Sequence, residues 1–285
     1  MARRSVLFSP GDKPELMKKA PGTGADTIVF DLEDAVAPGR KSEARDAVTG
    51  VITDRSFDPD CEVCVRINPD PETASADIES ILSEESRLDA VMFPKVESKE
   101  DVETLYGLLH PQGRELPVIA LCESAQGILS AEEIAAADPV DAVAFGAEDL
   151  SADIGAIRTE GGEEVSYARQ HVVLAAGAAG IDAIDTVFTD IEETDRLAEE
   201  TAFARQLGYD GKLAIHPAQV GVINDAFTPS PDDVEWAKRV LAAVGDAESS
   251  QQGVFRVDDE MVDAPLIARA ENIMDRYEAA SDGGE

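Results

Sequence analysis

The sequence predicts an α/β fold in which eight parallel strands close into a barrel and helices cover its outside. Short apolar or β-branched runs alternate with segments of helical periodicity, and eight such strand–helix pairs can be counted. The strand candidates are apolar throughout, as expected where helices cover one face and side chains fill the barrel on the other. The length of 285 residues suits one (β/α)8 or TIM barrel, because such barrels typically need about 250 residues.

The expected strands recur at regular intervals, over residues 6–9, 27–31, 63–67, 90–93, 118–122, 142–145, 183–187 and 213–215. Amphipathic helices are expected between them, for example over 15–20, 42–52, 101–109, 131–137, 165–179 and 193–207. A further helix over 232–244 would complete the barrel. Repeated strand-then-helix units imply a closed parallel barrel.

The chain continues beyond what a minimal barrel needs. Residues 248–253 read as a flexible connection and 265–279 as a final helix. We therefore predict a barrel domain over 1–245 and a C-terminal helical extension over 246–285. Such an extension is commonly a lid or an oligomer contact, with plain packing as the alternative.

The charge balance is strongly acidic, since 59 acidic residues against 24 basic ones give a formal net charge of −35. A field of this sign repels nucleic-acid phosphates and anionic membrane surfaces, so we expect neither as a partner. The acids are dispersed over expected helix surfaces, for example at Glu192, Glu193 and Asp195. At 1 M salt the Debye length falls to about 3 Å and screens their repulsion. The pattern favours a protein from a halophile over an ordinary acidic protein.

The amino terminus and the cysteines indicate the cellular compartment in which the protein is expected. Residues Arg3 and Arg4 run straight into an expected strand without a long apolar stretch, which favours a cytoplasmic protein. Three cysteines, Cys61, Cys64 and Cys122, are an odd number and disfavour a disulfide framework. The Cys61–Cys64 pair lacks a second pair or a nearby His to complete a zinc site, so we expect buried or half-buried thiols, with a redox or metal role as the lesser alternative.

Active sites of such barrels lie at the carboxyl ends of the strands, and polar residues crowd these positions. In chain order they are Ser9-Pro10-Gly11, Glu33-Asp34, Arg66 and Asn68, Lys95 and Glu97, Glu123-Ser124, Glu148-Asp149, Asp185-Thr186 and His216. Carboxylates placed close together raise one another's pKa and cost stability. A bound cation would remove that cost.

Glu123 and Asp149 follow the fifth and sixth expected strands, so their carboxylates can converge on one ion. Two carboxylates completed by water and substrate oxygens describe a magnesium site, whereas zinc would favour His or Cys ligands. The alternative is that each acid caps the helix that follows it.

Cations occupy two further positions. Arg66 ends the third expected strand, where a permanently charged guanidinium could hold a carboxylate or stabilise an enolate oxygen. An ion pair with the neighbouring acids is the alternative, and both interpretations can hold.

Lys13, Lys18 and Lys19 cluster in an early turn and helix of a lysine-poor chain. The cluster indicates either a binding site for phosphate groups or, equally, solvated surface charge.

Taken in order, these segments resemble the citrate lyase β-subunit-like family, which includes the malyl-CoA, methylmalyl-CoA and citramalyl-CoA lyases. The segments that carry the resemblance are RSVLFSPG at 4–11, DLEDAV at 31–36, RIN at 66–68, PKVE at 94–97, ESAQG at 123–127, FGAEDL at 145–150 and IHP at 215–217. They span nearly the whole chain. Ser124 stands where the family more usually has Thr, a change that keeps the hydroxyl.

The resemblance implies roles for residues at the matching positions. Glu123 and Asp149 would ligate Mg²⁺, with Mn²⁺ able to substitute, and Arg66 would contact the thioester or the keto acid. Backbone amides near Ala147 and Glu148 would hold the keto-acid carboxylate, and Lys13 and Lys19 would meet CoA phosphates. Residues in supporting positions would be Glu33, Asp34, Lys95 and His216.

The resemblance also implies a catalytic acid on the C-terminal lid, which closes over a neighbouring subunit's site in a homotrimer or hexamer. The segment EMVDAP at 260–265 matches that lid, and Asp263 would be the acid. The surplus final helix then belongs to the same lid.

The implied activity is a magnesium-dependent carbon–carbon lyase that converts a 3-hydroxyacyl-CoA into a 2-oxo acid and an acyl-CoA. Rival interpretations are a malyl-CoA thioesterase, an aldolase with a Schiff base on Lys95, the β subunit of citrate lyase acting on an acyl carrier protein, and a non-enzymatic acyl-CoA or metal-binding scaffold. The sequence leaves the 2-oxo acid open.

Overall fold

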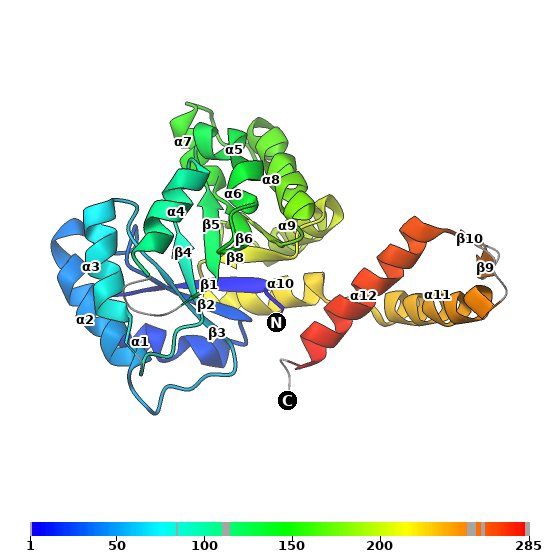
Figure 1. Ribbon diagram of the computed structural model, residues 1–285, viewed down its shortest axis with the longest axis horizontal. Coiled ribbons are helices and arrows are strands. Elements are labelled where there is room, and N and C mark those ends of the chain that lie inside the picture. Colours follow the sequence, from blue (N-terminus) through cyan, green and yellow to red (C-terminus); the bar gives the residue numbers. More distant parts are fainter. Residues whose placement is uncertain (1, 84, 110–114, 250–254, 258–259, 283–285) are drawn as a thin grey trace. The chain divides into compact units, whose positions relative to one another are not determined.

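The computed structural model describes residues 2–83, 85–109, 115–249, 255–257 and 260–282. The chain divides into two compact units, one over Arg3–Asp225 and the other from Ala226 onward, to which the first two residues also belong. The first unit contains a closed parallel barrel surrounded by helices (Figure 1).

The barrel strands follow one another in chain order around the barrel. They are β1 (Ser5–Pro10), β2 (Thr27–Asp31), β3 (Glu62–Arg66), β4 (Ala90–Phe93), β5 (Val118–Cys122), β6 (Val140–Phe145), β7 (Asp182–Asp185) and β8 (Gly211–Ala214). Each pairs in parallel with the next, and β8 pairs with β1. The predicted TIM barrel is therefore confirmed, although β7 and β8 end before the expected 187 and 215.

The helices of this unit follow the strands. They are α1 (Pro14–Met17), α2 (Lys41–Ile52), α3 (Pro71–Ile81), α4 (Lys99–Gly107), α5 (Ala125–Leu129), α6 (Ala131–Ala135), α7 (Ala147–Asp153), α8 (Ser166–Ala179), α9 (Thr194–Leu207) and α10 (Pro217–Phe227). Their boundaries have local causes: Asp70 accepts a hydrogen bond from the Thr73 amide at the start of α3, and α9 ends at Gly208, whose φ of 106° suits glycine.

Two helix predictions need correction. The first helix ends at Met17 instead of continuing to 20, because a 3-10 turn (Ala20–Thr23) follows it. The helix directly after β8 is α10, which the sequence analysis did not name. The helix expected over 232–244 exists as α11 (Pro231–Ser249), but it groups with the second unit.

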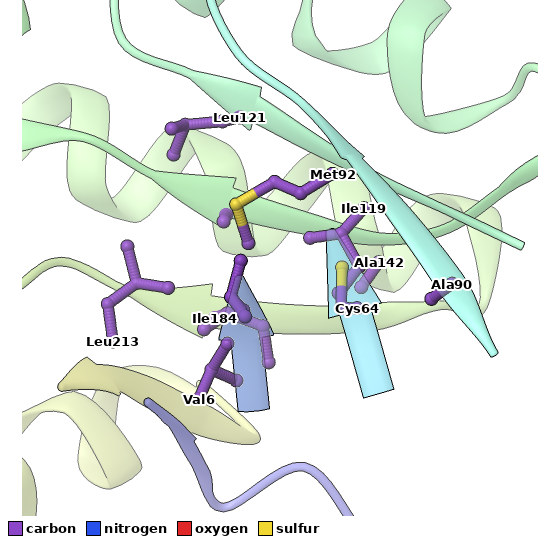
Figure 2. Packing of buried hydrophobic residues seen from close by; sticks show 11 residues of the cluster. Val6, Cys64, Ala90, Met92, Ile119, Leu121, Ala142, Ile184 and Leu213 are labelled. Carbon is purple, nitrogen blue, oxygen red and sulfur yellow. The ribbon is translucent and has the colours of Figure 1, made fainter. Parts of the chain in front are cut away.

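The barrel interior is filled by side chains from successive strands (Figure 2). Val6 of β1, Met92 of β4 and Ile184 of β7 are fully buried there, and Leu121 and Leu213 are at most 3% exposed. A packed interior makes the barrel a rigid support for the residues at its strand ends.

The second unit contains α11, a hairpin of β9 (Phe255–Val257) and β10 (Glu260–Val262), and α12 (Ala264–Asp282). Val234 and Val240 of α11 share an apolar cluster with Val262, Ala270 and Ile273. The expected final helix is α12. Of the connection expected over 248–253, residues 250–253 lie outside the described residues. The domain division at 245 stays a prediction. Within the described ranges, no helix combines the length and apolarity needed to cross a membrane.

A buried ion cluster lies between the barrel and its helix layer. Asp185 of β7 accepts hydrogen bonds from Arg169 of α8 at 2.8 and 2.7 Å and from Lys212 of β8 at 2.6 Å. Burial alone would raise the pKa of Asp185, but the charges of Lys212 and Arg169 outweigh it and lower that pKa. The cluster ties α8 to two neighbouring strands.

Replacing Asp185 with Asn should lower the free energy of unfolding by about 3–5 kcal/mol, because it leaves two buried cations without their counter-ion. The lowered pKa of Asp185 means that its contribution is present above the unfolded-state pKa and is lost as pH falls through the folded-state pKa. As the pH is lowered, the free energy of unfolding of Asp185→Asn should therefore fall less steeply than that of the wild-type protein. Denaturant unfolding between pH 3 and 7 measures both effects. Glu199→Gln, an exposed change on α9, is the control, and equal stability of the two variants would contradict the expectation.

Candidate active site at the carboxyl ends of the strands

A cavity of about 370 Å³ opens at the carboxyl ends of the strands. Its lining has an apolar part and a polar part. The apolar part consists of Phe8, Pro10, Ala35, Leu121, Gly146, Ala147, Val187, Leu213 and Ile215, and the polar part of Asp31, Asp34, Arg66, Glu123, Glu148, Asp149 and Thr186. The cavity thus lies where the strand-end rule predicts an active site.

Glu123 and Asp149 come from neighbouring strand ends. Glu123 directly follows β5, and Asp149 lies in the first turn of α7 after β6, the strand that pairs with β5. Glu123 is 4% exposed. Burial, followed by the charges of Asp149 and Glu33, raises the pKa of Glu123 to about 8. The surroundings of Glu123 therefore disfavour its ionised form, and a nearby positive charge would stabilise that form.

The backbone fixes the Glu123 carboxylate. A Cβ on Gly146 would lie 2.5 Å from Glu123 Cβ and 2.7 Å from Oε2, so only glycine fits beside it. The Lys95 amide donates to Glu123 Oε1 at 2.9 Å from a left-handed backbone conformation, with φ of 52°. The capping alternative for Glu123 is wrong, because the hydroxyl of Ser124 accepts from the Gly127 amide at the start of α5.

Arg66 is held by the acids that follow β2. Its Nε and Nη2 donate to the two carboxylate oxygens of Asp31 at 2.8 and 2.7 Å, and its Nη1 lies 2.9 Å from Glu33 Oε2. Asp34 is 3.9 Å away. Burial lowers the pKa of the guanidinium, but the hydrogen bonds and charge of Asp31 outweigh it and raise that pKa. The cation is therefore permanent and fixed in direction.

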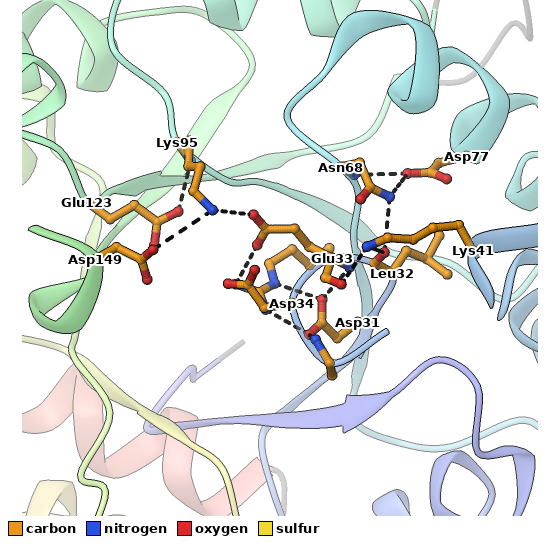
Figure 3. A network of polar contacts seen from close by, with 12 residues as sticks. Asp31, Leu32, Glu33, Asp34, Lys41, Asn68, Asp77, Lys95, Glu123 and Asp149 are labelled. Carbon is orange, nitrogen blue, oxygen red and sulfur yellow. Dashed lines mark hydrogen bonds and ion pairs between the residues drawn. The ribbon is translucent and has the colours of Figure 1, made fainter. Parts of the chain in front are cut away.

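Lys95 links the acid groups across the site (Figure 3). Its Nζ donates to Glu33 Oε1 at 2.6 Å and lies 3.9 Å from Asp149 Oδ1. Burial lowers the pKa of Lys95, but the hydrogen bond to Glu33 outweighs it and raises that pKa. The amine stays protonated, which disfavours the Schiff-base interpretation, because that chemistry needs a neutral amine.

The residues present fit a magnesium ion. Glu123 and Asp149 offer carboxylate oxygens, which Mg²⁺ prefers, and Mg²⁺ usually keeps several waters beside one or two carboxylates. Burial and the neighbouring carboxylates raise the pKa of Glu123, and a cation bound between these groups would favour its ionised form. Among the residues that the structure describes, no three His, Cys, Asp or Glu side chains converge on one point. The pair would thus hold the ion with help from water and substrate.

Several residues expected in this region lie at its edge. The Glu148 side chain pairs with Arg158 at 2.9 Å, and Glu148 lines the cavity beside Ala147. His216 is exposed, and its Nδ1 accepts from the Ala218 amide.

The remaining expected residues lie outside the cavity lining. Lys13 directly precedes α1 and Lys19 directly precedes the 3-10 turn that follows it; both are exposed, and Lys18 pairs with Asp54. Asp263 is exposed at the start of α12 in the second unit.

The sequence pattern did not single out Asp31 or Gly146, and it misplaced one residue. Asp31 orients Arg66, and Gly146 packs against Glu123. Thr186, expected at the rim, accepts a 3.0 Å hydrogen bond from the Ala147 amide through its Oγ1. The signal that could have identified Asp31 is its position at the end of β2, close to Glu33 and Asp34 in the sequence. Asp185, expected at the rim, instead points into the helix layer.

Comparisons with known proteins agree with this geometry. The model of the HpcH/HpaI aldolase/citrate lyase family matches residues 4–217. The mitochondrial citramalyl-CoA lyase of Rattus norvegicus is 36% identical over 95% of this chain and 85% of its own. The (3S)-malyl-CoA thioesterase of Cereibacter sphaeroides is 36% identical over 97% of this chain and 95% of its own.

A solved structure is similar over almost the whole chain. Protein CitE from Mycobacterium tuberculosis, in complex with magnesium, acetoacetate and coenzyme A, superposes with a TM-score of 0.79 at 36% identity. The match covers 97% of this chain and 98% of that one.

Substituting Gly146 with Ala should weaken Mg²⁺ binding by about 10- to 100-fold, because the new methyl group displaces the Glu123 carboxylate. Glu123→Gln should weaken it at least as much. Titration calorimetry with Mg²⁺ or Mn²⁺ measures both. Gly50→Ala is the matched control, since nothing lies within 4 Å of its added Cβ. Unchanged affinity in both site variants would place the metal elsewhere.

Proposed function

The chain belongs to the HpcH/HpaI aldolase/citrate lyase family, and from this we propose that it is a magnesium-dependent carbon–carbon lyase acting on a 3-hydroxyacyl-CoA thioester. Substrates of this kind, such as malyl-CoA, methylmalyl-CoA or citramalyl-CoA, are split into a 2-oxo acid and an acyl-CoA. The observation that carries the proposal is one cavity that holds buried Glu123 and partly exposed Asp149 next to the fixed guanidinium of Arg66.

The reaction breaks the bond between the hydroxyl-bearing carbon and the carbon next to the thioester. The hydroxyl proton passes to solvent water, the hydroxyl oxygen becomes the keto oxygen, and the electron pair of the broken bond passes to the thioester as an enolate. A carboxylic acid then protonates the enolate carbon to give the acyl-CoA and regains its proton from solvent. Bound magnesium, held by Glu123 and Asp149, supplies Lewis-acid polarisation of the hydroxy-acid end.

Arg66 offsets the negative charge of the enolate oxygen. Asp31 takes two of its N–H groups, so the guanidinium already points in one direction before substrate arrives. Because the guanidinium is already oriented, it does not have to move when negative charge develops on the enolate oxygen. It therefore stabilises the transition state more than the ground state. The backbone amides near Ala147 and Glu148 hold the keto-acid carboxylate in this scheme.

Asp263 protonates the enolate carbon, or removes that proton in the reverse condensation. It precedes α12 in the C-terminal unit, and we assign it to a neighbouring subunit's site in a homotrimer or hexamer. Lys13 and Lys19 are assigned to the CoA phosphates on the strength of their exposed, local positive charge. A cytoplasmic location and adaptation to high salt stay predictions from the sequence.

Hydrolysis of the same thioester is the second candidate, because a relative of equal identity is named a malyl-CoA thioesterase. Water attack on the thioester carbonyl would use the same cation and the same carboxylate pair. The two reactions differ in their products, since hydrolysis releases free thiol whereas cleavage of the carbon–carbon bond releases a keto acid.

With Mg²⁺ in high-salt buffer, the protein should release 2-oxo acid from malyl-, methylmalyl- or citramalyl-CoA without an equal amount of free thiol, and EDTA should stop the reaction. Keto acid is followed as its hydrazone and thiol with a disulfide reagent. Thiol without keto acid would identify the hydrolase. Turnover that survives EDTA would argue against magnesium chemistry altogether.

Replacing Asp263 with Asn should reduce deuterium exchange at the acyl-CoA carbon next to the thioester by at least about 100-fold, because the proton donor is lost. Mg²⁺ affinity should not change. Exchange in D₂O, followed by mass spectrometry, and metal titration test the two statements. Asp275→Asn, an exposed change on α12, is the control. An exchange-active Asp263 variant would remove this residue from the mechanism.

A further inference from the structure

Resting on the lyase function proposed above, we propose that the Thr186 hydroxyl is a substrate-binding group, which donates a hydrogen bond to the carboxylate of the 2-oxo acid. The Ala147 amide, assigned above to that carboxylate, then acts through Thr186 instead of touching the substrate itself. Three features of the Thr186 side chain support this assignment: its place in the cavity wall, the partner of its oxygen, and the direction left for its proton.

Thr186 directly follows β7 and is buried in the wall of the cavity. Along β7, the Ile184 side chain belongs to the barrel interior and the Asp185 side chain points into the helix layer, so the next side chain returns to the interior side. Thr186 is 4% exposed there. A polar group with so little access to bulk water takes its hydrogen-bond partners from the protein or from a ligand.

The oxygen of the Thr186 hydroxyl already has a donor. The Ala147 amide donates to Thr186 Oγ1 at 3.0 Å. A backbone amide carries a single proton, so in this arrangement the Ala147 amide serves Thr186 and not the substrate. A hydroxyl that accepts one hydrogen bond still has its own proton to donate.

The acceptor for that proton is left to a ligand. Among the residues that the structure describes, the Thr186 side chain takes part in one hydrogen bond, in which its oxygen is the acceptor. The space that the side chain lines is the active-site cavity, so the second partner of the hydroxyl comes from there. The Ala147 amide also polarises the hydroxyl, because hydrogen bonds in a chain strengthen one another.

The turn between β6 and α7 determines which end of the substrate Thr186 meets. Within this turn, Gly146 packs against Glu123, and Asp149 lies two residues beyond Ala147. The hydroxyl is therefore bonded to the same turn that positions both proposed magnesium ligands. The acid end of the substrate is the end that bound magnesium polarises, so its carboxylate is the acceptor expected beside Thr186. A neutral donor binds it without adding charge to the rim, through a charge-assisted hydrogen bond.

Thr186→Val removes the hydroxyl and keeps the shape of the side chain. It should weaken binding of pyruvate or glyoxylate to the magnesium-loaded protein by about 10- to 100-fold, because a hydrogen bond to a charged group is lost. Thr186→Ser keeps the hydroxyl and should stay within about threefold of wild type. Titration calorimetry measures these affinities. Thr189→Val is the matched control, since Thr189 is exposed and does not line this cavity.

The affinity for Mg²⁺ alone separates substrate contact from a purely structural role. If Thr186 only fixed the turn after β6, its loss would displace Asp149 and the Gly146 backbone that packs against Glu123, and Mg²⁺ would bind about 10- to 100-fold more weakly. We expect the Mg²⁺ affinity of Thr186→Val, measured without keto acid, to remain within about threefold of wild type. Retained Mg²⁺ binding also shows that the variant is folded.

Three results would overturn the inference while leaving the lyase function standing. They are unchanged keto-acid affinity in Thr186→Val, a parallel loss of Mg²⁺ and keto-acid affinity in that variant, and an equal loss of keto-acid affinity in Thr186→Ser. Release of keto acid from none of the thioesters by the wild-type protein would instead refute the proposed function, and this inference with it.

Discussion

The ion pair between Arg66 and Asp31 is the interaction on which the rest of the site depends. The parallel register of β2 and β3 places these two residues side by side at the ends of their strands. Both oxygens of Asp31 bind the guanidinium, and they also accept the amides of Glu33 and Ala35, so the pair fixes the loop after β2 as well. Glu33 then bridges Arg66 to Lys95 after β4. One strand-end pair thus orders the polar contacts along this part of the rim.

The Glu123 carboxylate is held rigidly among other carboxylates that repel it. Glu123 is surrounded by other acids, yet it cannot move away, because Gly146 packs against it and the Lys95 amide binds it. Ordinary proteins relax such repulsion by exposing one of the groups. Here the packed barrel core beneath the cavity prevents relaxation, so the repulsion is available to be relieved by a cation.

The sequence predicted the barrel and several residues that line its cavity, because both follow from simple periodic rules. Apolar runs predict the strands, and the carboxyl end of each strand points to Arg66 at the end of β3, Glu123 directly after β5 and Asp149 in the first turn after β6. The same rule misplaced Asp185, since Ile184 faces the barrel interior and the next side chain must face the helices. Gly146 and the left-handed backbone of Lys95 leave no periodic signal, because their roles depend on contacts between separate strand ends. The sequence pattern did not predict α10, which begins at Pro217, the last residue of the segment at 215–217 that was interpreted as part of the site.

The assignment of proton transfer to Asp263 has an electrostatic argument in its favour. The rim already holds Glu33, Glu123 and Asp149, and burial together with their mutual repulsion raises the pKa of Glu123 to about 8. A further carboxylate built into that rim would raise these pKa values again and add to the repulsion. In the proposed mechanism the acid, Asp263, belongs to the other compact unit of the chain, so its charge is not part of the barrel's own set of rim residues. Metal binding and proton transfer are then assigned to residues of different units, and each set can be altered without changing the charges of the other.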